Sequence, residues 1–389
     1  MKSELKNICN LINEKISANE LINNNLASTY VSTESMLPNK RGITKPSSIP
    51  SKGTTTAYKK DDVLVSNIRP YFKKIWSANY DGVCSNDVLV FRAKNTADAN
   101  FLYYVLANDD FFVYSMATSK GTKMPRGDKA SIMKYEVASF DLNTQRKIAS
   151  ILKPIDKKIE LNNAINNNLE QQAQALFKSW FVDFEPFDGE LPSSWTNEKL
   201  GNVCNCVLGG TPSRAKPEYW NGTIPWINSG EVNNFRIIKP SETITELGLT
   251  KSATKLLPLK TTVIAITGAT LGQVSLLEID ACANQSVVGI IPNDDYPYEY
   301  IYPLIKQSIN ELTSHQTGGA QQHINKQNVE SLDILVPTAA DLDKYCNTVH
   351  NLYEMIATNC FENEYLTSLR DTLLPKLMSG ELDVSGIDL

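Results

Sequence analysis

The stretch LNTQRKIASILKPIDKKIELNNAINNNLEQQAQALFKSWFVDFEPF, residues 142–187, decides the fold of this chain. Apolar or amide residues recur in it at alternating steps of four and three, which is the heptad pattern of a helix that packs along another helix. These seam positions are Ile148, Leu152, Ile155, Ile159, Asn162, Asn166, Leu169, Ala173, Leu176 and Trp180. Pro154 lacks an amide donor, so the helix either kinks there or restarts with this proline in its first turn.

A second stretch with the same pattern lies near the C-terminus. Each of its seam positions follows the first set by 197 residues: Tyr345, Val349, Leu352, Ile356, Asn359, Asn363, Leu366, Arg370, Leu373 and Leu377. Arg370, opposite Ala173 in this comparison, is the poorest match. Two Asn pairs that recur in phase after so long an interval indicate an internal duplication.

The seam asparagines have two interpretations. If the helices pack antiparallel, Asn162 faces Asn363 and Asn166 faces Asn359, and buried amides of this kind fix the register of a helix pair. Otherwise the asparagines mark an exposed part of each helix. The symmetric position of the pairs near the middle of each seam favours the first interpretation.

Length and composition predict two or three domains for the 389 residues. No apolar run is long enough to span a bilayer, and no signal-peptide pattern opens the chain. Seven cysteines are scattered singly, and the three histidines do not group with them as metal ligands. We therefore expect a reduced, cytoplasmic protein without a metal site.

Two globular regions, 1–141 and 188–337, share short segments. Strand-like runs lie at 62–66 and 87–91 in the first and at 262–267 and 286–291 in the second, and 100–108 is helix-like. Four segments align in the same order: Leu5–Asn10 with Leu200–Asn205, Val63–Val65 with Val263–Ala265, Cys84–Asp87 with Cys282–Gln285, and Gly121 with Gly319. The chain is thus divided into 1–141, 142–187, 188–337 and 338–389. The predicted fold is α+β, with two mixed α/β domains separated by two long antiparallel coiled-coil helices and a pseudo-twofold internal repeat.

Signatures of a catalytic or nucleotide site are absent from the sequence. The stretch 209–213, GGTPS, is Gly-rich but lacks the Gly-Lys-Ser/Thr end of a P-loop. No Asn-Pro-Pro-aromatic tetrapeptide of an amino-methyltransferase and no nuclease-like Asp…Glu-x-Lys cluster is present. We expect no catalytic residue, no metal and no cofactor in this chain.

The loops are rich in side chains that suit base edges, since Arg and Lys pair with guanine, Asn and Gln with adenine, and Thr with the thymine methyl. The DNA-binding candidates of the first region are Asn67, Arg69, Tyr71, Lys73, Lys74, Lys120, Thr122, Lys123 and Arg126. Those of the second region are Thr211, Ser213, Arg214, Lys216, Asn228, Thr270, Gln273, Gln321, Gln322 and His323. Taken singly, each of them is better explained as a solvated loop residue, but two clusters on equivalent loops favour DNA recognition.

The charge distribution favours a protein partner for the second helix. The whole chain carries a net charge of −5, which argues against a simple nucleic-acid binder. Residues 1–140 carry +6, whereas residues 338–389 carry −6. An acidic helix is unsuited to phosphates, so its partner is a protein unless the charge only marks a solvated face.

These features together resemble the specificity subunit (HsdS) of Type I restriction-modification systems, over essentially the whole chain. The most specific piece is KKIELNNAINNNLEQQAQALFKSWFVDFEPF, residues 157–187, which is similar to the central conserved region of that family. LLPKLMSGEL, residues 373–382, is similar to its distal conserved region. The segments SNIRPYFKKI and GTKMPR resemble one subtype of target recognition domain, and LGGTPS…EYW…IPW with residues 260–291 resembles another.

The resemblance implies that each domain reads one half of a bipartite site in double-stranded DNA from the major groove. It implies that the helices set the gap between the half-sites and dock two methylation subunits (HsdM), which use S-adenosylmethionine. Restriction subunits (HsdR), which use ATP and Mg²⁺, complete the complex, and the specificity subunit itself has no catalytic centre.

Two alternatives belong to other functional classes. One is a helical protein–protein adaptor without DNA binding, and the other is a self-sufficient nuclease or methylase. The missing catalytic motifs argue against the second.

Overall fold

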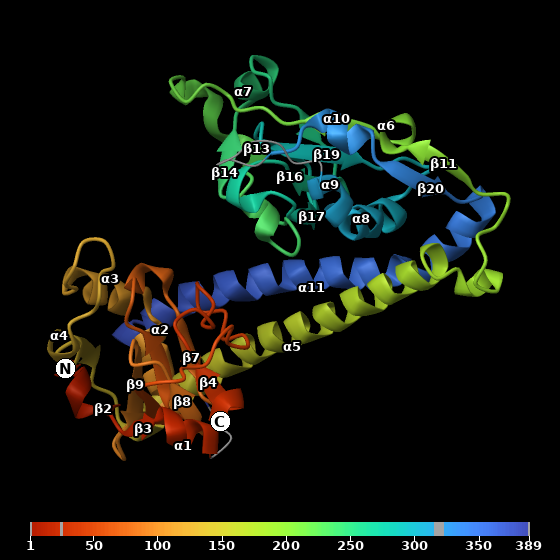
Figure 1. Ribbon diagram of the computed structural model, residues 1–389. Helices are drawn as coiled ribbons and strands as arrows, with labels where there is room; N and C mark the ends of the chain where they lie inside the picture. Colours follow the sequence, from red (N-terminus) through yellow and green to blue (C-terminus); the bar gives the residue numbers. More distant parts are fainter. Residues whose placement is uncertain (1, 24–25, 315–322, 388–389) are drawn as a thin grey trace. The chain divides into compact units, whose positions relative to one another are not determined.

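The computed structural model describes residues 2–23, 26–314 and 323–387, which form two compact units (Figure 1). Unit 1 comprises Met1–Ile159 and Tyr365–Leu389, and unit 2 comprises Glu160–Glu364. The chain passes from unit 1 to unit 2 within helix α5 (Leu142–Phe181) and returns within helix α11 (Ala339–Ser379). Each long helix is therefore shared by the two units.

Unit 1 contains two four-stranded sheets and one strand pair. The first sheet has the antiparallel order β2 (Cys9–Ile12), β9 (Val88–Ala93), β6 (Val63–Ser66), β7 (Ile75–Ser77). The second has the order β3 (Lys15–Ser17), β5 (Thr54–Tyr58), β8 (Gly82–Cys84), β4 (Tyr30–Val31), with β4 parallel to β8. β1 (Lys2–Glu4) pairs with β10 (Glu136–Ala138). The central strands β6 and β9 are Val- and Leu-rich and buried, as suits the middle of a covered sheet.

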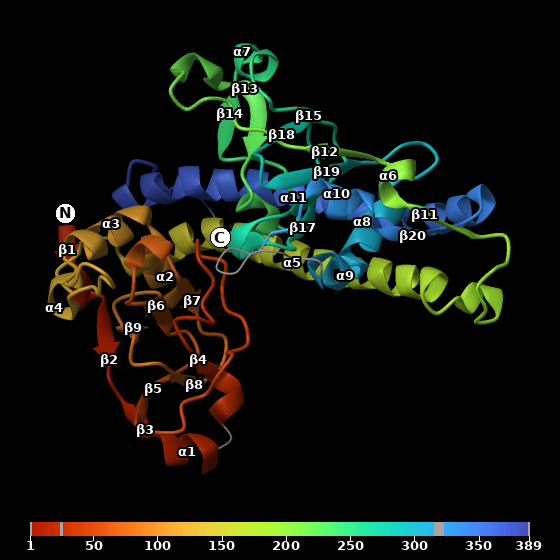
Figure 2. The ribbon, with the colours of Figure 1, turned by 45° about the horizontal axis from the view of Figure 1, so that its top comes forward.

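Four helices join these strands in unit 1: α1 (Ala18–Asn23), α2 (Ala99–Ala107), α3 (Asp109–Ala117) and α4 (Lys129–Ile132). α2 lies across the first sheet, over β6, β7 and β9 (Figure 2). It begins at Asp98, whose carboxylate accepts hydrogen bonds from two N–H groups of the first turn, and this capping fixes the helix start. Its buried face joins Leu152 of α5 and Leu374 of α11 in one core.

Unit 2 is built in the same way. One sheet has the antiparallel order β12 (Asn205–Leu208), β19 (Val287–Ile291), β16 (Thr262–Ala265), β17 (Val274–Leu276). The other has the order β14 (Glu242–Ile244), β13 (Trp220–Ile227), β18 (Ala281–Ala283), β15 (Leu256–Leu257), and β11 (Thr196–Lys199) pairs with β20 (Asp333–Val336). The short helices are α6 (Leu200–Val203), α7 (Glu246–Thr250), α8 (Tyr298–Gln307), α9 (Ile309–Ser314) and α10 (Lys326–Glu330).

The pairing of the strands shows the internal repeat. β12, β19, β16 and β17 have the order and directions of β2, β9, β6 and β7. In the second sheet, Cys84 lies between a parallel partner strand and an antiparallel one, and so does Cys282. These cysteines, and the aligned runs 63–65 and 263–265 in β6 and β16, occupy equivalent places. The α+β fold with an internal repeat is confirmed, while Gly319, the last aligned position, lies outside the described residues.

Both long helices have capped starts. The Asp141 carboxylate accepts from the Thr144 N–H at 2.8 Å, and the Thr338 hydroxyl accepts from the Asp341 N–H at 3.2 Å. α5 continues through Pro154 as one helix, so it does not restart there. Two structures were predicted at Pro154, a kink or a new helix start, and the new helix start is therefore wrong.

The predicted seam residues are buried or half-buried in both helices. In unit 2, Asn162 Nδ2 donates to Asn363 Oδ1 at 3.0 Å, and Asn359 Nδ2 donates to Asn166 Oδ1 at 2.8 Å. The structure therefore contains both amide pairs expected for antiparallel helices. The helices also bury residues outside the seam, such as Phe177 and Tyr353, because they pack against the α/β part of their unit as well as against each other.

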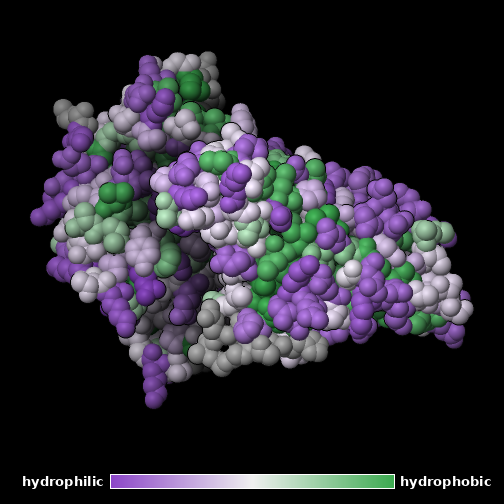
Figure 3. All heavy atoms as spheres, turned by 90° about the horizontal axis from the view of Figure 1, so that it is seen from above, coloured by the Kyte–Doolittle hydropathy of each residue, from purple (hydrophilic) through white to green (hydrophobic). Residues whose placement is uncertain are grey.

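The surface is mostly hydrophilic on the face shown in Figure 3, with hydrophobic side chains in patches. In the described part of the chain, no helix has both the length and the apolar content needed to cross a membrane.

Candidate nucleic-acid interface

In unit 1, the two candidate loops of the sequence meet at one end of the first sheet. The Arg69 N–H donates to the Pro125 carbonyl at 2.8 Å, and Ile68 forms a β-bridge with Arg126. The turn before β9 joins them, since the Asn67 N–H donates to the Asp87 carbonyl at 2.8 Å. The segments 67–69, 85–87 and 120–126 therefore form one loop cluster, which we call cluster 1.

Arg126 is the cation of cluster 1 that is best placed to meet a ligand. Its side chain is 53% exposed, and Asp87 holds it side-on, with Nε 3.2 Å from Oδ1 and Nη2 3.3 Å from Oδ2. A guanidinium held in this way keeps the edge formed by Nη1 and the second N–H of Nη2 for another pair of acceptors. The O6 and N7 atoms of guanine are such a pair.

A pocket of about 500 Å³ adjoins this pair and is lined by Arg69, Phe72, Lys74, Asp87 and Met124, among others. Arg69 has a left-handed backbone conformation, with φ 51°, and its buried Nε has no hydrogen-bond partner among the described residues. A non-glycine residue in this conformation stores strain, which is often found at binding sites. The pocket therefore combines walls of polar and apolar side chains with an arginine that still has donors to use.

The other candidates of unit 1 differ in how they are held. Asn67 is buried, and three lysines are engaged by protein oxygens: Lys73 by Asp109 at 2.7 Å, Lys74 by the Thr33 carbonyl at 2.6 Å, and Lys120 by Asp128 at 2.7 Å. Tyr71, Thr122 and Lys123 are exposed.

Unit 2 gathers loops at the equivalent end of its sheet. The Ile266 N–H donates to the Ser286 carbonyl at 2.9 Å, the Ile324 N–H donates to the Ile266 carbonyl at 3.0 Å, and Thr267 forms a β-bridge with His323. The segments 266–267, 284–286 and 323–324 thus form cluster 2. Gln321 and Gln322 lie outside the described residues.

The Gly209-Gly210 pair brings a further loop to cluster 2. The Gly210 N–H donates to the Ala283 carbonyl at 2.8 Å, and a Cβ on Gly209 would lie 2.2 Å from the Asn284 carbonyl oxygen. The close backbone approach therefore requires glycine. It places Thr211 where its hydroxyl donates to the Gln285 side chain.

Arg214 is the unit 2 counterpart of Arg126 in chemistry, though not in position. Its guanidinium lies 3.6 Å from the ring centroid of Trp220 and binds both Glu242 oxygens, at 2.5 and 2.9 Å, while the side chain stays 55% exposed. Stacking and a two-point carboxylate contact together fix the plane of the group.

The remaining candidates of unit 2 are either exposed or held by contacts within their own loops. Ser213 is exposed, and the Lys216 ammonium lies 3.0 Å from the Tyr219 hydroxyl. The Asn228 side chain accepts from the Gly230 N–H at 2.8 Å, which is a turn contact. Thr270 donates to the Thr267 carbonyl at 3.3 Å, and Gln273 is exposed.

Sequence reasoning missed the acids and amides that hold these side chains. Asp87 and Gln285 were aligned as the last residues of equivalent segments, but neither was chosen as a site residue. Their signal was their position one or two residues before β9 and β19, at the end of the sheet where the other loops gather. Glu242 had no comparable signal.

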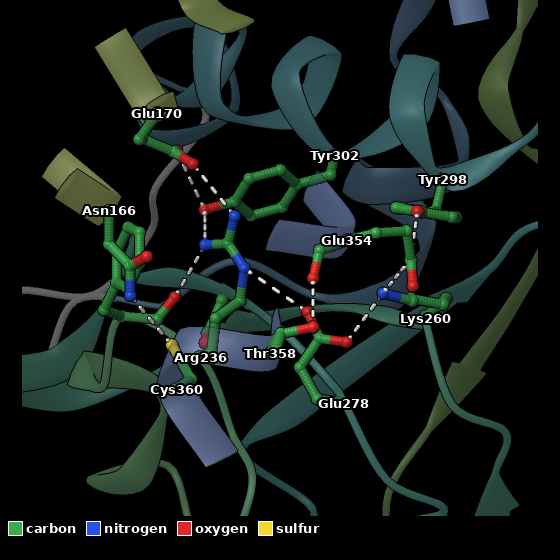
Figure 4. Close-up of polar contacts among 12 residues, drawn as sticks. Asn166, Glu170, Arg236, Lys260, Glu278, Tyr298, Tyr302, Glu354, Thr358 and Cys360 are labelled. Atoms are coloured by element: carbon green, nitrogen blue, oxygen red, sulfur yellow. Dashed lines mark hydrogen bonds and ion pairs between the residues drawn. The ribbon is translucent and has the colours of Figure 1, made fainter. Parts of the chain in front are cut away.

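A buried contact between helix and α/β part was also missed, and it occurs in both units. In unit 1 the Tyr104 hydroxyl donates to Asp156 of α5 at 2.8 Å, and Arg370 pairs with the same carboxylate at 2.8 Å. In unit 2 the Tyr302 hydroxyl donates to Glu170 of α5 at 3.2 Å, and Arg236 pairs with it at 2.9 Å. Each unit thus joins a tyrosine, a carboxylate of α5 and an arginine; Figure 4 shows the unit 2 contact.

Among the described residues, no three or more His, Cys, Asp or Glu side chains are grouped so that they could hold a metal ion.

Two repeated α/β units on a shared helix pair, each with a loop cluster at one sheet end, define a class of protein: a modular recognition scaffold. The family model described as the Type I restriction modification DNA specificity domain matches residues 1–171 and 192–359, and the chain belongs to this family. This family is the non-catalytic component that gives Type I restriction enzymes their DNA sequence specificity.

Individual relatives are similar over most of the chain. The specificity subunit of the Type I restriction enzyme HindI from Haemophilus influenzae is 27% identical, over 84% of this chain and 87% of its own. The MjaIX specificity subunit from Methanocaldococcus jannaschii is also 27% identical, over 76% of this chain and 71% of its own. The crystal structure of a Type-I restriction-modification S subunit from M. genitalium has the same fold, with a TM-score of 0.60 and 17% identity over 97% of this chain and 96% of that one.

Proposed function

We propose that cluster 1 and cluster 2 each read one half of a bipartite DNA site from the major groove. The observation that carries this proposal is the repeat itself: the same sheet end in each unit gathers its candidate loops, and the loops differ in sequence while the strands agree. A shared scaffold with different loops is the arrangement expected when two modules read two different ligands. Arg126 and Arg214 supply the donor forks that guanine recognition needs.

The chain acts with partner subunits in this proposal. Two methylation subunits, which use S-adenosylmethionine, dock on the helix pair, and restriction subunits, which use ATP and Mg²⁺, join them. The acidic character of residues 338–389 supports a protein partner at these helices. The seven cysteines are all free thiols, which supports a cytoplasmic location.

The test is a map of methylated adenines in a host that carries this gene together with genes for its methylation partner. We expect one motif with two specific half-sites and an unspecific gap of constant length. A methylated motif without a gap, or the same methylation after deletion of this gene, would contradict the proposal.

A further inference from the structure

Unit 2 contains a chain of charged side chains between its α/β part and the two long helices, which we call the junction network (Figure 4). Glu170 of α5 pairs with Arg236 at 2.9 Å and with Lys306 at 2.6 Å. On its other side, Arg236 Nε lies 3.5 Å from Glu278 Oε1. The α/β part of unit 2 thus meets α5 through two cations that share one carboxylate.

The network continues from Glu278 to the second long helix. Lys260 Nζ lies 2.7 Å from Glu278 Oε2 and 2.9 Å from Glu354 Oε1 of α11. The Tyr298 hydroxyl donates to the same Glu354 carboxylate at 2.9 Å. Charges therefore alternate from α5 through the α/β part to α11, and both helices are held by the same set of contacts.

The centre of this network is deeply buried, whereas Glu354 at its α11 end is 47% exposed. The side chains of Arg236, Glu278 and Glu170 are 1%, 2% and 8% exposed. Taking such charges out of water costs several kcal/mol for each ion, so well-packed apolar side chains in their place are often equally or more stabilising. Arg236 Nε and Glu278 Oε1 also lack hydrogen-bond partners among the described residues, so the network is incompletely satisfied. A gain in stability over an apolar contact is therefore a poor explanation for its presence.

Such a network fixes the relative orientation of the parts that it joins, and an apolar contact does not. Apolar side chains tolerate sliding and rotation, whereas the planar Arg236 guanidinium can donate to Glu170 through Nη2 and to the Tyr302 hydroxyl through Nη1 in few orientations. The corresponding contact in unit 1 is built from other groups. There the α/β part contributes the neutral Tyr104, and the cation Arg370 comes from α11 itself.

We propose that the junction network fixes the orientation of the second recognition module on the helix pair, and that it thereby determines which gap between half-sites is accepted. Glu170 and Arg236 are positioning residues in this account, and they read no base. The inference rests on the proposed function. It assigns selectivity for the gap to specific buried residues, separately from the loops that read the half-sites.

The experiment maps adenine methylation for the parent and for the double variant Glu170→Gln/Arg236→Met, each with its methylation partner. Removal of both members of a buried pair is far less disruptive than removal of one, so we expect this variant to fold. The same half-sites should be methylated, but sites whose gap is one base pair longer or shorter should gain methylation by roughly ten-fold, which corresponds to about 1.4 kcal/mol. Arg236→Lys, which keeps the charge and loses the fork, should give a smaller broadening of the same kind.

The matched control is Glu364→Gln, which removes an ion pair of 2.6 Å between the same loop region, at Lys239, and α11. The side chains of Lys239 and Glu364 are 66% and 37% exposed, so this ion pair has little orienting effect. The gap between half-sites should therefore stay as in the parent. A double variant that keeps the single parental gap, at any level of methylation, overturns the inference. A parent without a bipartite motif overturns the proposed function instead, so the two failures are distinguishable.

Discussion

Arg126 and Asp87 show at the residue scale how a loop prepares a side chain for base recognition. The two-point contact with Asp87 fixes the guanidinium plane and leaves one edge of the fork free. We predict that Arg126→Lys changes only the half-site read by unit 1, because lysine cannot make the two-point contact with guanine. A contact of this kind contributes roughly 1–3 kcal/mol of discrimination, and a map of methylated adenines detects its loss.

Two further variants test this assignment. Arg214→Lys should change only the other half-site. Lys2→Gln removes an exposed ion pair with Glu136, on the strand pair β1–β10 outside cluster 1, and should leave both half-sites unchanged. Changes in both half-sites after a single substitution would show that the two modules do not read independently.

Glu170 makes a pH-dependent contribution to stability. Burial alone raises the pKa of its carboxyl, but Arg236 and Lys306 outweigh burial and lower the pKa from its ordinary value of 4.5 to about 2. The folded state therefore holds this proton less tightly than the unfolded state, and the stabilisation is complete above pH 4.5 and lost as the pH falls towards 2. The contribution is on the order of 3 kcal/mol.

We predict that Glu170→Gln lowers the free energy of unfolding at pH 7, and that its cost shrinks as the pH falls from about 4.5 to about 2. Denaturant titrations of parent and variant at several pH values measure this difference. Glu278, whose pKa is raised by burial, takes up its proton first and does so in both proteins, so its effect largely cancels. A difference that does not vary with pH would show that the ion pair contributes nothing.

The residue types at the candidate site could be predicted from the sequence. Which of these side chains keep donors for a ligand, and which are bound by protein oxygens, could not. Arg126 and Lys120 are both basic residues of the same loop. One keeps an open donor edge, whereas the other meets Asp128, which caps α4 in the same segment. Which lysine finds a protein oxygen depends on contacts between distant segments, such as Lys74 with the Thr33 carbonyl. Such contacts cannot be predicted from composition and spacing.

At the scale of elements, the helix pair was predictable because its seam is periodic. The phase of the asparagines was enough to pair Asn162 with Asn363 and Asn166 with Asn359. The wider buried face, with Phe177, Glu170 and Tyr353, was not predicted, because the heptad pattern describes one neighbouring helix and these side chains meet another neighbour.

The length of α5 should set the gap between half-sites. We predict that inserting Asn-Ala-Ile-Asn, a copy of residues 163–166, after Asn162 lengthens the gap by about one or two base pairs and leaves both half-sites unchanged. Four residues add roughly 6 Å and about 1.1 helical turns, and DNA advances about 3.4 Å per base pair. Part of the extension is absorbed, because Asn359 and Asn363 lose their partners.

The measurement for this insertion is again a genome-wide map of methylated adenines. An insertion of the same four residues in the exposed segment 189–191, outside both helices, serves as the control and should keep the parental gap. A changed half-site with the old gap would contradict the role of the helix.

At the scale of the whole molecule, the repeat was predictable from a few aligned segments, whereas the division into units was not. The strands at 63–66 and 262–265 were found because they are short apolar runs between turn signals. The division of α5 and α11 between two units depends on which residues touch in space, and a continuous heptad pattern gives no sign of it.

We predict that the purified chain binds random duplex DNA weakly and that binding falls steeply with salt. A contact dominated by phosphates releases counterions, so the logarithm of the binding constant falls by roughly 0.9 for each phosphate contact per tenfold rise in salt. Fluorescence anisotropy at several salt concentrations measures this slope. With S-adenosylmethionine and Mg²⁺ present, the same preparation should neither methylate nor cut, and turnover that follows the pure chain through chromatography would contradict this.

Unit 1 is formed by two segments of the chain that are separated by unit 2. This arrangement determines the order in which the chain can fold during synthesis. Leu374, Leu377 and Val384 complete the core of unit 1, but they leave the ribosome after all of unit 2. Unit 2 is one continuous segment, so it can close its core first, although protein domains usually fold from the N-terminus onward. Until the last helical turns emerge, the apolar face of α2 stays uncovered by them, and the nascent N-terminal part keeps some of its apolar surface exposed to water.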